Sequence, residues 1–147
     1  MDKIAQSANS SRSKRGNSFE DDIIKILKGM CKRDKIRRFE RKPKIFGGEF
    51  NPDFIIEKVD GTFICIDTTT TARSDRLRGK QWDAYGTKLF YNEERNSKIV
   101  AFVVVQDIDT KKNEEDNFRR CKERAKLPHS ALDDVISVKE LIDYLEH

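Results

Sequence analysis

Residues 52–69 read PDFIIEKVDGTFICIDTT, and this stretch decides the fold of the chain. Apolar and β-branched runs flank Asp60-Gly61, a dipeptide that favours a tight hairpin turn. Such runs on either side of a turn signal are typical of strands. We therefore predict two antiparallel strands, over residues 53–59 and 62–71, joined by this turn.

Two aspartates lie on these strands at positions that should converge. Side chains alternate between the faces of a strand, so Asp67 and Thr69 point the same way, and the turn sets Asp53 roughly opposite them. Carboxylates beside a buried sheet are costly unless a cation lies between them. Hard oxygen ligands suit magnesium. Glu20, from an earlier predicted helix, is a candidate third acid.

Asp67 and Glu20 could each have a purely structural role. Asp67 breaks an apolar strand, and an ion pair with Arg73 or Lys80 would explain it without a metal. Glu20 could be an ordinary acid in the first turn of a helix, where the macrodipole favours negative charge.

The rest of the chain predicts helices and strands around this hairpin. Ser18 is the expected N-cap of a helix over residues 19–33, which has a 3–4 residue apolar repeat. The further expected elements are a strand over 36–41, a turn or short strand over 45–50, a helix over 77–94, a strand over 99–106 buried on both faces, a helix over 114–125, a short edge strand over 135–138 and a helix over 139–146.

This order predicts an α/β fold with one domain over residues 16–147. A mixed sheet with helices on both sides accommodates an α-β-β-β-α-β order. The helix between strands 62–71 and 99–106 makes those strands parallel neighbours. Residues 1–15 are rich in serine and basic groups and predict a flexible basic arm.

Four apolar side chains of the helix over residues 77–94 are expected to make its packing contacts. We interpret Trp82 as core or interface packing, with a base-stacking platform as the alternative. The four side chains are Leu77, Trp82, Tyr85 and Leu89.

Charge and composition narrow the class of protein. The chain has 147 residues and a net charge of +4, and residues 1–49 hold 14 Lys or Arg against 7 Asp or Glu. An uneven basic excess suits a polyanion-binding surface, although a solvated basic face is the plain alternative. The three cysteines predict no disulfide framework. Without an apolar run of roughly 20 residues or a signal peptide, we expect no membrane span and a cytoplasmic protein.

Four short motifs occur in an informative order. They are Arg15-Gly16-Asn17-Ser18-Phe19-Glu20, Pro52-Asp53, Asp67-Thr68-Thr69 and Gln81-Trp82-Asp83-Ala84-Tyr85. Over residues 15–106 this pattern resembles the PD-(D/E)xK nuclease superfamily, which includes type II restriction endonucleases, archaeal Holliday-junction resolvases and RecB-like exonucleases. The first motif is similar to the opening of the resolvases, and the last to the Gln-x-x-x-Tyr element of RecB-like members.

The resemblance implies a restriction-endonuclease-like fold and metal-dependent cleavage of DNA. Magnesium, for which manganese may substitute, would be held by Asp53, Asp67, the Thr68 carbonyl and Glu20. Such an ion lowers the pKa of a bound water and clamps the phosphate. Gln81 would support the metal ligands.

The chain departs from the family at Thr69, where the family has a lysine. A neutral hydroxyl can orient a water but does not replace a positive charge in the transition state. Two interpretations follow. Either a displaced cation, with Lys80 and Arg76 the leading candidates, restores the charge, or the site binds DNA without cutting it.

The leading hypothesis is a magnesium-dependent endodeoxyribonuclease acting as a homodimer, because one centre cuts one strand of a duplex. Restriction-type and junction-resolving activity both stay open. A catalytically inactive DNA-binding module on the same scaffold is the alternative, and an interaction protein with a coincidental acid pair is the third reading. The residues expected to contact DNA phosphates are Arg12, Lys14, Arg15, Arg73, Arg76 and Arg78.

Overall fold

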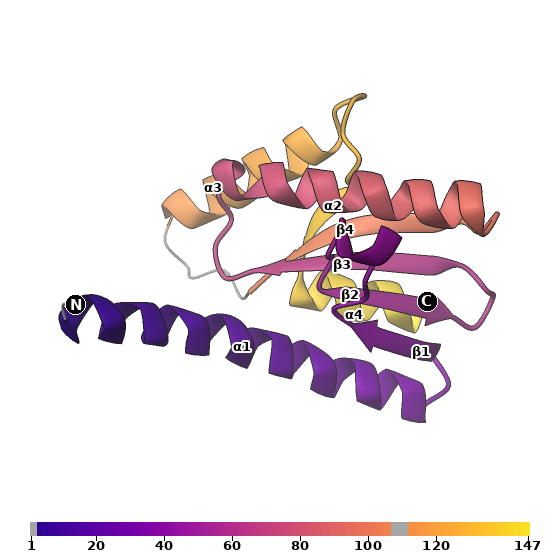
Figure 1. Cartoon of the computed structure of the whole chain (residues 1–147), viewed down its shortest axis with the longest axis horizontal. Helices are drawn as coiled ribbons and strands as arrows, with labels where there is room; N and C mark the ends of the chain where they lie inside the picture. The colour runs from indigo at the N-terminus through magenta and orange to yellow at the C-terminus, as the bar shows by residue number, and fades with distance from the viewer. Residues whose placement is uncertain (1–2, 107–111) are drawn as a thin grey trace.

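A five-stranded mixed sheet forms the centre of the molecule (Figure 1). The computed structural model describes the backbone of residues 3–106 and 112–147, and the side chains of residues 18–106 and 114–147. The strands, in their order across the sheet, are β1 (Ile36–Arg41), β2 (Phe54–Lys58), β3 (Phe63–Thr69), β4 (Ile99–Val105) and β5 (Asp134–Ser137).

The pairing of the strands confirms the predicted sheet. β1–β2 and β2–β3 are antiparallel, whereas β3–β4 and β4–β5 are parallel. The turn between β2 and β3 is the predicted one, since Gly61 has φ of 87° and its N–H donates to the Lys58 carbonyl over 3.1 Å. A positive φ is a conformation that glycine adopts without steric cost. The two predicted parallel neighbours, β3 and β4, lie side by side.

Helices cover both faces of the sheet (Figure 1). α1 (Lys3–Lys32) and α4 (Val138–Glu146) lie on one face, and α2 (Leu77–Leu89) and α3 (Lys112–Ala125) on the other. The short helical turns are η1 (Phe46–Gly48), η2 (Ser74–Arg76) and η3 (Phe90–Glu94), which extends α2 by one wide turn.

Alternation along β3 divides the buried side chains between two cores. Ile64 and Ile66 pack with Phe19 and Ile23 of α1, whereas Phe63 and Cys65 pack with residues of α2 and α3. Continuing this alternation puts the next odd-numbered residues on the α2 face. β4 is buried against both cores, as its continuous apolar run predicts.

The first helix is longer than predicted. It begins at Lys3, so Ser18 is an exposed interior residue and not an N-cap. Residues 3–15, expected to be an arm, have a helical backbone here. The segment contains no proline and several good helix formers, so no local feature ends the helix before its apolar repeat begins. Met1 and Asp2, and the side chains of Arg12, Lys14 and Arg15, lie outside the described residues.

The contact face of α2 also differs from the expectation. Trp82 and Tyr85 are 54% and 53% exposed, and the buried residues of the helix are Leu77, Ala84, Gly86 and Thr87. The ring of Phe50 lies where a Cβ on Gly86 would be. The helix therefore packs through Leu77, as predicted, and through small residues, whereas Trp82, Tyr85 and Leu89, which were expected to make packing contacts, face outward. None of the helices among the described residues has the length and apolarity to cross a membrane.

Candidate functional site

Asp53 and Asp67 meet at the open end of the β2–β3 hairpin. The paired strands end at Phe54 and Ile66, so the two aspartates occupy the next facing positions. The Asp53 N–H donates to Asp67 Oδ1 over 3.0 Å. In return, the Thr68 N–H and Oγ1 donate to Asp53 Oδ2 over 2.7 and 2.8 Å. The carboxylates thus extend the hydrogen bonding of the sheet beyond its last backbone pair.

Asp67 is a buried acid whose charge is poorly compensated. It is 4% exposed, and burial raises the pKa of its carboxyl well above the usual range. The positive charge of Lys80 lowers this pKa, whereas the negative charges of Asp53 and Asp83 raise it further. Burial opposes ionisation because the charged form loses its hydration.

The expected ion-pair partners of Asp67 are bound elsewhere. Arg73 pairs with Asp75, with Nε and Oδ1 3.2 Å apart. The Lys80 ammonium donates to the Thr68 carbonyl oxygen over 2.9 Å. The description of Asp67 as one half of a simple ion pair therefore finds no support among the described residues.

Lys80 brings a positive charge to the end of β3, next to Thr69. It lies in the first turns of α2, is half-buried and reaches across to β3. The Thr68 carbonyl, which the resemblance implies as a metal ligand, is the acceptor of this lysine. Arg76, the other candidate cation, is exposed on η2.

Glu20 is not brought to the acid pair. It lies on α1 beside Phe19, on the opposite face of the sheet, and its carboxylate binds Arg41 over 3.3 Å. Helical periodicity places Glu20 on the edge of the buried stripe but does not state which face of the sheet the helix covers. Glu20, predicted to be the third metal ligand, instead pairs with Arg41 of β1.

Thr69 and Gln81 are also engaged away from the acid pair. Thr69 Oγ1 donates to the Thr71 carbonyl over 2.9 Å, closing a turn at the end of β3. Gln81 Nε2 donates to Ser130 Oγ over 2.7 Å, and its Oε1 accepts from the Ala131 N–H over 2.8 Å. To orient a water, Thr69 would have to give up a contact that closes a turn. To support the metal ligands, Gln81 would have to give up contacts that hold a loop.

Asp83 is a site residue that the sequence analysis missed. Its Oδ1 accepts from the Asn51 N–H over 3.0 Å, and its charge raises the pKa of Asp67. Residues three apart on a helix are surface neighbours. The three-residue spacing from Lys80 to Asp83 puts both side chains on the same side of α2. This spacing could have identified Asp83 if the packing of α2 over the acid pair had been known.

The acid pair fits a magnesium ion that completes its shell with water and phosphate. The described residues hold no group of three or more His, Cys, Asp or Glu arranged for a metal. Asp53 and Asp67 each use one oxygen for the hydrogen bonds above, and the second oxygen accepts none from a described residue. Magnesium is commonly held by one or two carboxylates together with waters and substrate phosphates.

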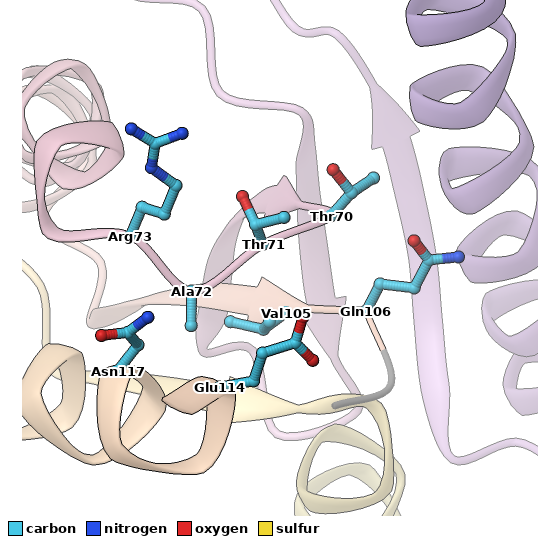
Figure 2. Close-up of a pocket in the computed structure, with 8 residues that line it drawn as sticks. All are labelled: Thr70, Thr71, Ala72, Arg73, Val105, Gln106, Glu114 and Asn117. Atoms are coloured by element: carbon cyan, nitrogen blue, oxygen red, sulfur yellow. The ribbon is translucent and has the colours of Figure 1, made fainter. Parts of the chain in front are cut away.

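A cavity of about 150 Å³ with a mixed polar and apolar lining lies past the end of β3. Figure 2 shows its lining, with the Glu114 carboxylate near Val105 and the Thr70 and Thr71 hydroxyls on the opposite side. Thr71 Oγ1 is buried and has no hydrogen-bond partner among the described residues. The other lining residues are Ala72, Arg73, Gln106 and Asn117.

The predicted DNA contacts of the central segment are accessible. Arg73, Arg76 and Arg78 are all exposed, on η2 and the start of α2. Comparisons of the chain with protein-family models, curated proteins and solved structures found no match. Function therefore rests on the chemistry of the site and its surroundings.

Proposed function

We propose that the protein is a magnesium-dependent DNA endonuclease that hydrolyses phosphodiester bonds at Asp53 and Asp67. The observation that carries this proposal is the buried carboxylate of Asp67, held against Asp53 and bound to no cationic side chain that the structure describes. Strongly raised acid pKa values cluster at functional sites, because such groups cost stability. A divalent cation would offset the charge that the described side chains leave uncompensated.

Asp53 and Asp67 would hold magnesium, or manganese in its place. When bound, the ion supplies an activated water and neutralises charge on the phosphate. Lys80 would provide the second positive charge, in the role that Thr69 cannot fill, by turning from the Thr68 carbonyl to the phosphate. Such preorganised charge acts on the transition state.

The surrounding basic residues would position the DNA. Arg73, Arg76 and Arg78, which are exposed, would contact phosphates on either side of the cut, and the basic residues of α1 would extend the contact. A homodimer would bring two centres to the two strands of a duplex. Restriction-type and junction-resolving cleavage are the two forms of this proposal, and the substrate distinguishes them.

A cleavage assay with matched variants tests the proposal. Supercoiled plasmid and a synthetic four-way junction are incubated with the wild type, Asp67→Asn, Lys80→Met and the control Lys88→Met, in magnesium or manganese. Lys88 lies on the same helix but pairs with Asp133 over 2.8 Å, away from Thr68. We expect Asp67→Asn to abolish cleavage, and Lys80→Met to slow it on the order of 100-fold. Lys88→Met should cleave normally.

The outcomes separate the alternatives. Fixed-length plasmid fragments support restriction-type cleavage, and selective cutting of the junction supports resolution. Full activity in Lys80→Met would refute the displaced-lysine role alone. Magnesium should also raise the melting temperature of the wild type and not of Asp67→Asn, because ligands stabilise the state that they bind.

A second candidate is an inactive DNA-binding module on the same scaffold. The bond from Lys80 to the Thr68 carbonyl favours it, since this cation already occupies a ligand position. Salt-sensitive DNA retention without cleavage in either metal would support it, and absence of DNA binding would contradict both candidates.

A further inference from the structure

An aromatic surface lies beside the acid pair, formed by Phe46 and Phe50 of the β1–β2 connection with Trp82 and Tyr85 of α2. Ring centroids are 5.9 Å apart for Phe46–Phe50 and 5.1 Å for Phe50–Trp82. The Trp82 and Tyr85 rings are 6.0 Å apart and inclined by only 28°. Phe50 is buried beneath them, whereas the other three rings are 39–54% exposed.

The loop that presents Phe46 has an unusual backbone. Phe46 has φ of 51° and Gly47 and Gly48 follow with φ of 71° and 102°. A left-handed conformation is a genuine outlier for a bulky residue. Such strain persists where the surroundings enforce it, and it clusters at functional positions. Here it holds an aromatic ring at the surface, with Phe46 also packed edge-on against Phe90 at 5.3 Å.

The aromatic surface is continuous with the proposed site. Phe50 is three residues from Asp53, and the intervening Asn51 N–H binds Asp83 of α2. Asp83, which directly follows Trp82, is also a surface neighbour of Lys80, and Lys80 binds the Thr68 carbonyl beside Asp67. A strand of nucleic acid with a phosphate at the acid pair therefore passes within reach of these rings.

The charge around the aromatic surface suits a polyanion. The segments that form it, residues 42–50 and 77–89, contain five basic and two acidic side chains. Of the two acids, Asp83 is already bound to the Asn51 N–H. The basic side chains are Lys42, Lys44, Arg78, Lys80 and Lys88, and the acidic ones are Glu49 and Asp83.

The exposed apolar area is small for a protein partner. Aromatic side chains offer about 150–250 Å² each, so three rings at roughly half exposure present on the order of 300 Å². A stable interface requires about 800 Å² from each partner. Nucleobases need less, because each stacks on a single ring.

We propose that the aromatic surface is a stacking platform for unpaired nucleobases next to the acid pair. The inference rests on the proposed function and adds its substrate class, which is DNA with a single-stranded segment beside the cut. Trp82 and Tyr85 hold the bases through their flat faces, and Lys42, Lys44 and Arg78 hold the backbone, whereas Lys88 is paired with Asp133. The platform selects for unpaired bases because the bases of a duplex are already stacked on one another.

Trp82 is the only tryptophan of the chain, so its fluorescence reports directly on stacking. The full chain is titrated in EDTA with a (dT)12 oligonucleotide, a 12-residue abasic strand of equal charge and a 12-base-pair duplex. We expect (dT)12 to quench Trp82 emission, and the abasic strand and duplex to leave it nearly unchanged. Because EDTA removes the metal, this readout does not depend on cleavage.

Two variants link the signal to the platform. Tyr85→Ser should weaken (dT)12 binding, measured by anisotropy of a labelled strand, roughly 5- to 150-fold, the range that one stacked base contributes. Tyr144→Ser changes an exposed tyrosine of α4, on the other face of the sheet, and should leave the binding unchanged.

Equal quenching by the abasic strand would overturn the proposal, because charge alone would then explain it. An emission change with protein concentration in the absence of DNA would also overturn it, in favour of contact between copies. Base-dependent quenching without cleavage would uphold the platform and refute the nuclease. Duplex cleavage without base-dependent quenching would do the reverse.

Discussion

Asp67 combines two properties that conflict in a purely structural side chain, burial and negative charge. Burial raises the pKa of its carboxyl, so the folded protein holds this proton more tightly than the unfolded chain, whose aspartates titrate near 3.8. Stability from this group is therefore complete below about pH 3.8 and is lost as the pH rises through the folded pKa.

Asp67→Asn should stabilise the protein at pH 8. The amide oxygen can still accept the Asp53 N–H, and the cost of burying a charge disappears. We expect the free energy of unfolding to rise at pH 8, with the gain shrinking as the pH falls toward 4, because the Asp67 carboxyl then becomes protonated in both the folded and the unfolded protein. Urea unfolding across this range measures it.

Asp75→Asn is the matched control, because this exposed acid pairs, among the side chains described, with exposed Arg73 alone. Exposed pairs contribute little, so its effect should stay within about 0.5 kcal/mol at any pH. A destabilised Asp67→Asn at pH 8 would contradict the electrostatic description of the site.

The sequence predicted the acid pair because its cause is local. One turn dipeptide and a two-residue periodicity set the register that brings Asp53 and Asp67 together. The contacts of Gln81 could not be predicted in this way, since its partners lie some 50 positions later in a loop. The position of Glu20 could not be predicted for a related reason, because the face of the sheet that α1 covers is a property of the whole fold.

Among the elements, α2 depends on one small residue for its position. Gly86 lets the Phe50 ring lie directly on the helix backbone, where a Cβ would collide with it. This contact explains why the helix has large side chains on its exposed face. Periodicity alone assigns the largest side chains to the core and misses a contact made through glycine.

Gly86→Ala should therefore destabilise the protein despite the higher helix propensity of alanine. Displacing the Phe50 ring should cost about 1–3 kcal/mol, as overpacking does. Gly79→Ala, in the same helix with open space around the new methyl group, should be neutral or stabilising by up to about 1 kcal/mol. Equal effects of the two substitutions in denaturant unfolding would contradict this packing.

The start of α1 can be tested at one serine. Ser18 lies inside a helix that begins at Lys3, so Ser18→Ala should be neutral or slightly stabilising. Ser137→Ala provides the comparison, since Ser137 caps α4 by accepting from the Glu140 N–H over 3.1 Å. That loss should cost about 1 kcal/mol. A similar cost for Ser18→Ala would mean that the helix begins at Ser18.

At the scale of the whole molecule, alternation and connection order were sufficient to predict the mixed sheet. A helix between two strands of one sheet favours their parallel pairing, and β3 and β4 obey this rule. The sequence also indicated which basic residues lie at the surface, although it did not show what they bind. Of the predicted phosphate contacts, Arg73, Arg76 and Arg78 are exposed on one short segment next to the acid pair.

DNA binding should depend on salt through these three arginines. Replacing all three with alanine should reduce the slope of log affinity against log salt by about 2.7, because each lost phosphate contact removes about 0.9. Lys139→Ala, which changes an exposed residue of α4, should leave the slope unchanged. Filter binding between 50 and 200 mM salt measures both. An unchanged slope in the triple variant would place the DNA elsewhere.

The hydrogen bonds that Asp53 and Asp67 exchange at the end of the hairpin have a consequence for the proposed turnover. The main chain, and not an incoming ion, sets the rotamers of Asp53 and Asp67, since each side chain is tethered by one oxygen to the neighbouring strand. The remaining oxygens are thus oriented in advance. Cations could enter and leave between reaction cycles without rearranging the sheet, and little reorganisation energy would be added to each round.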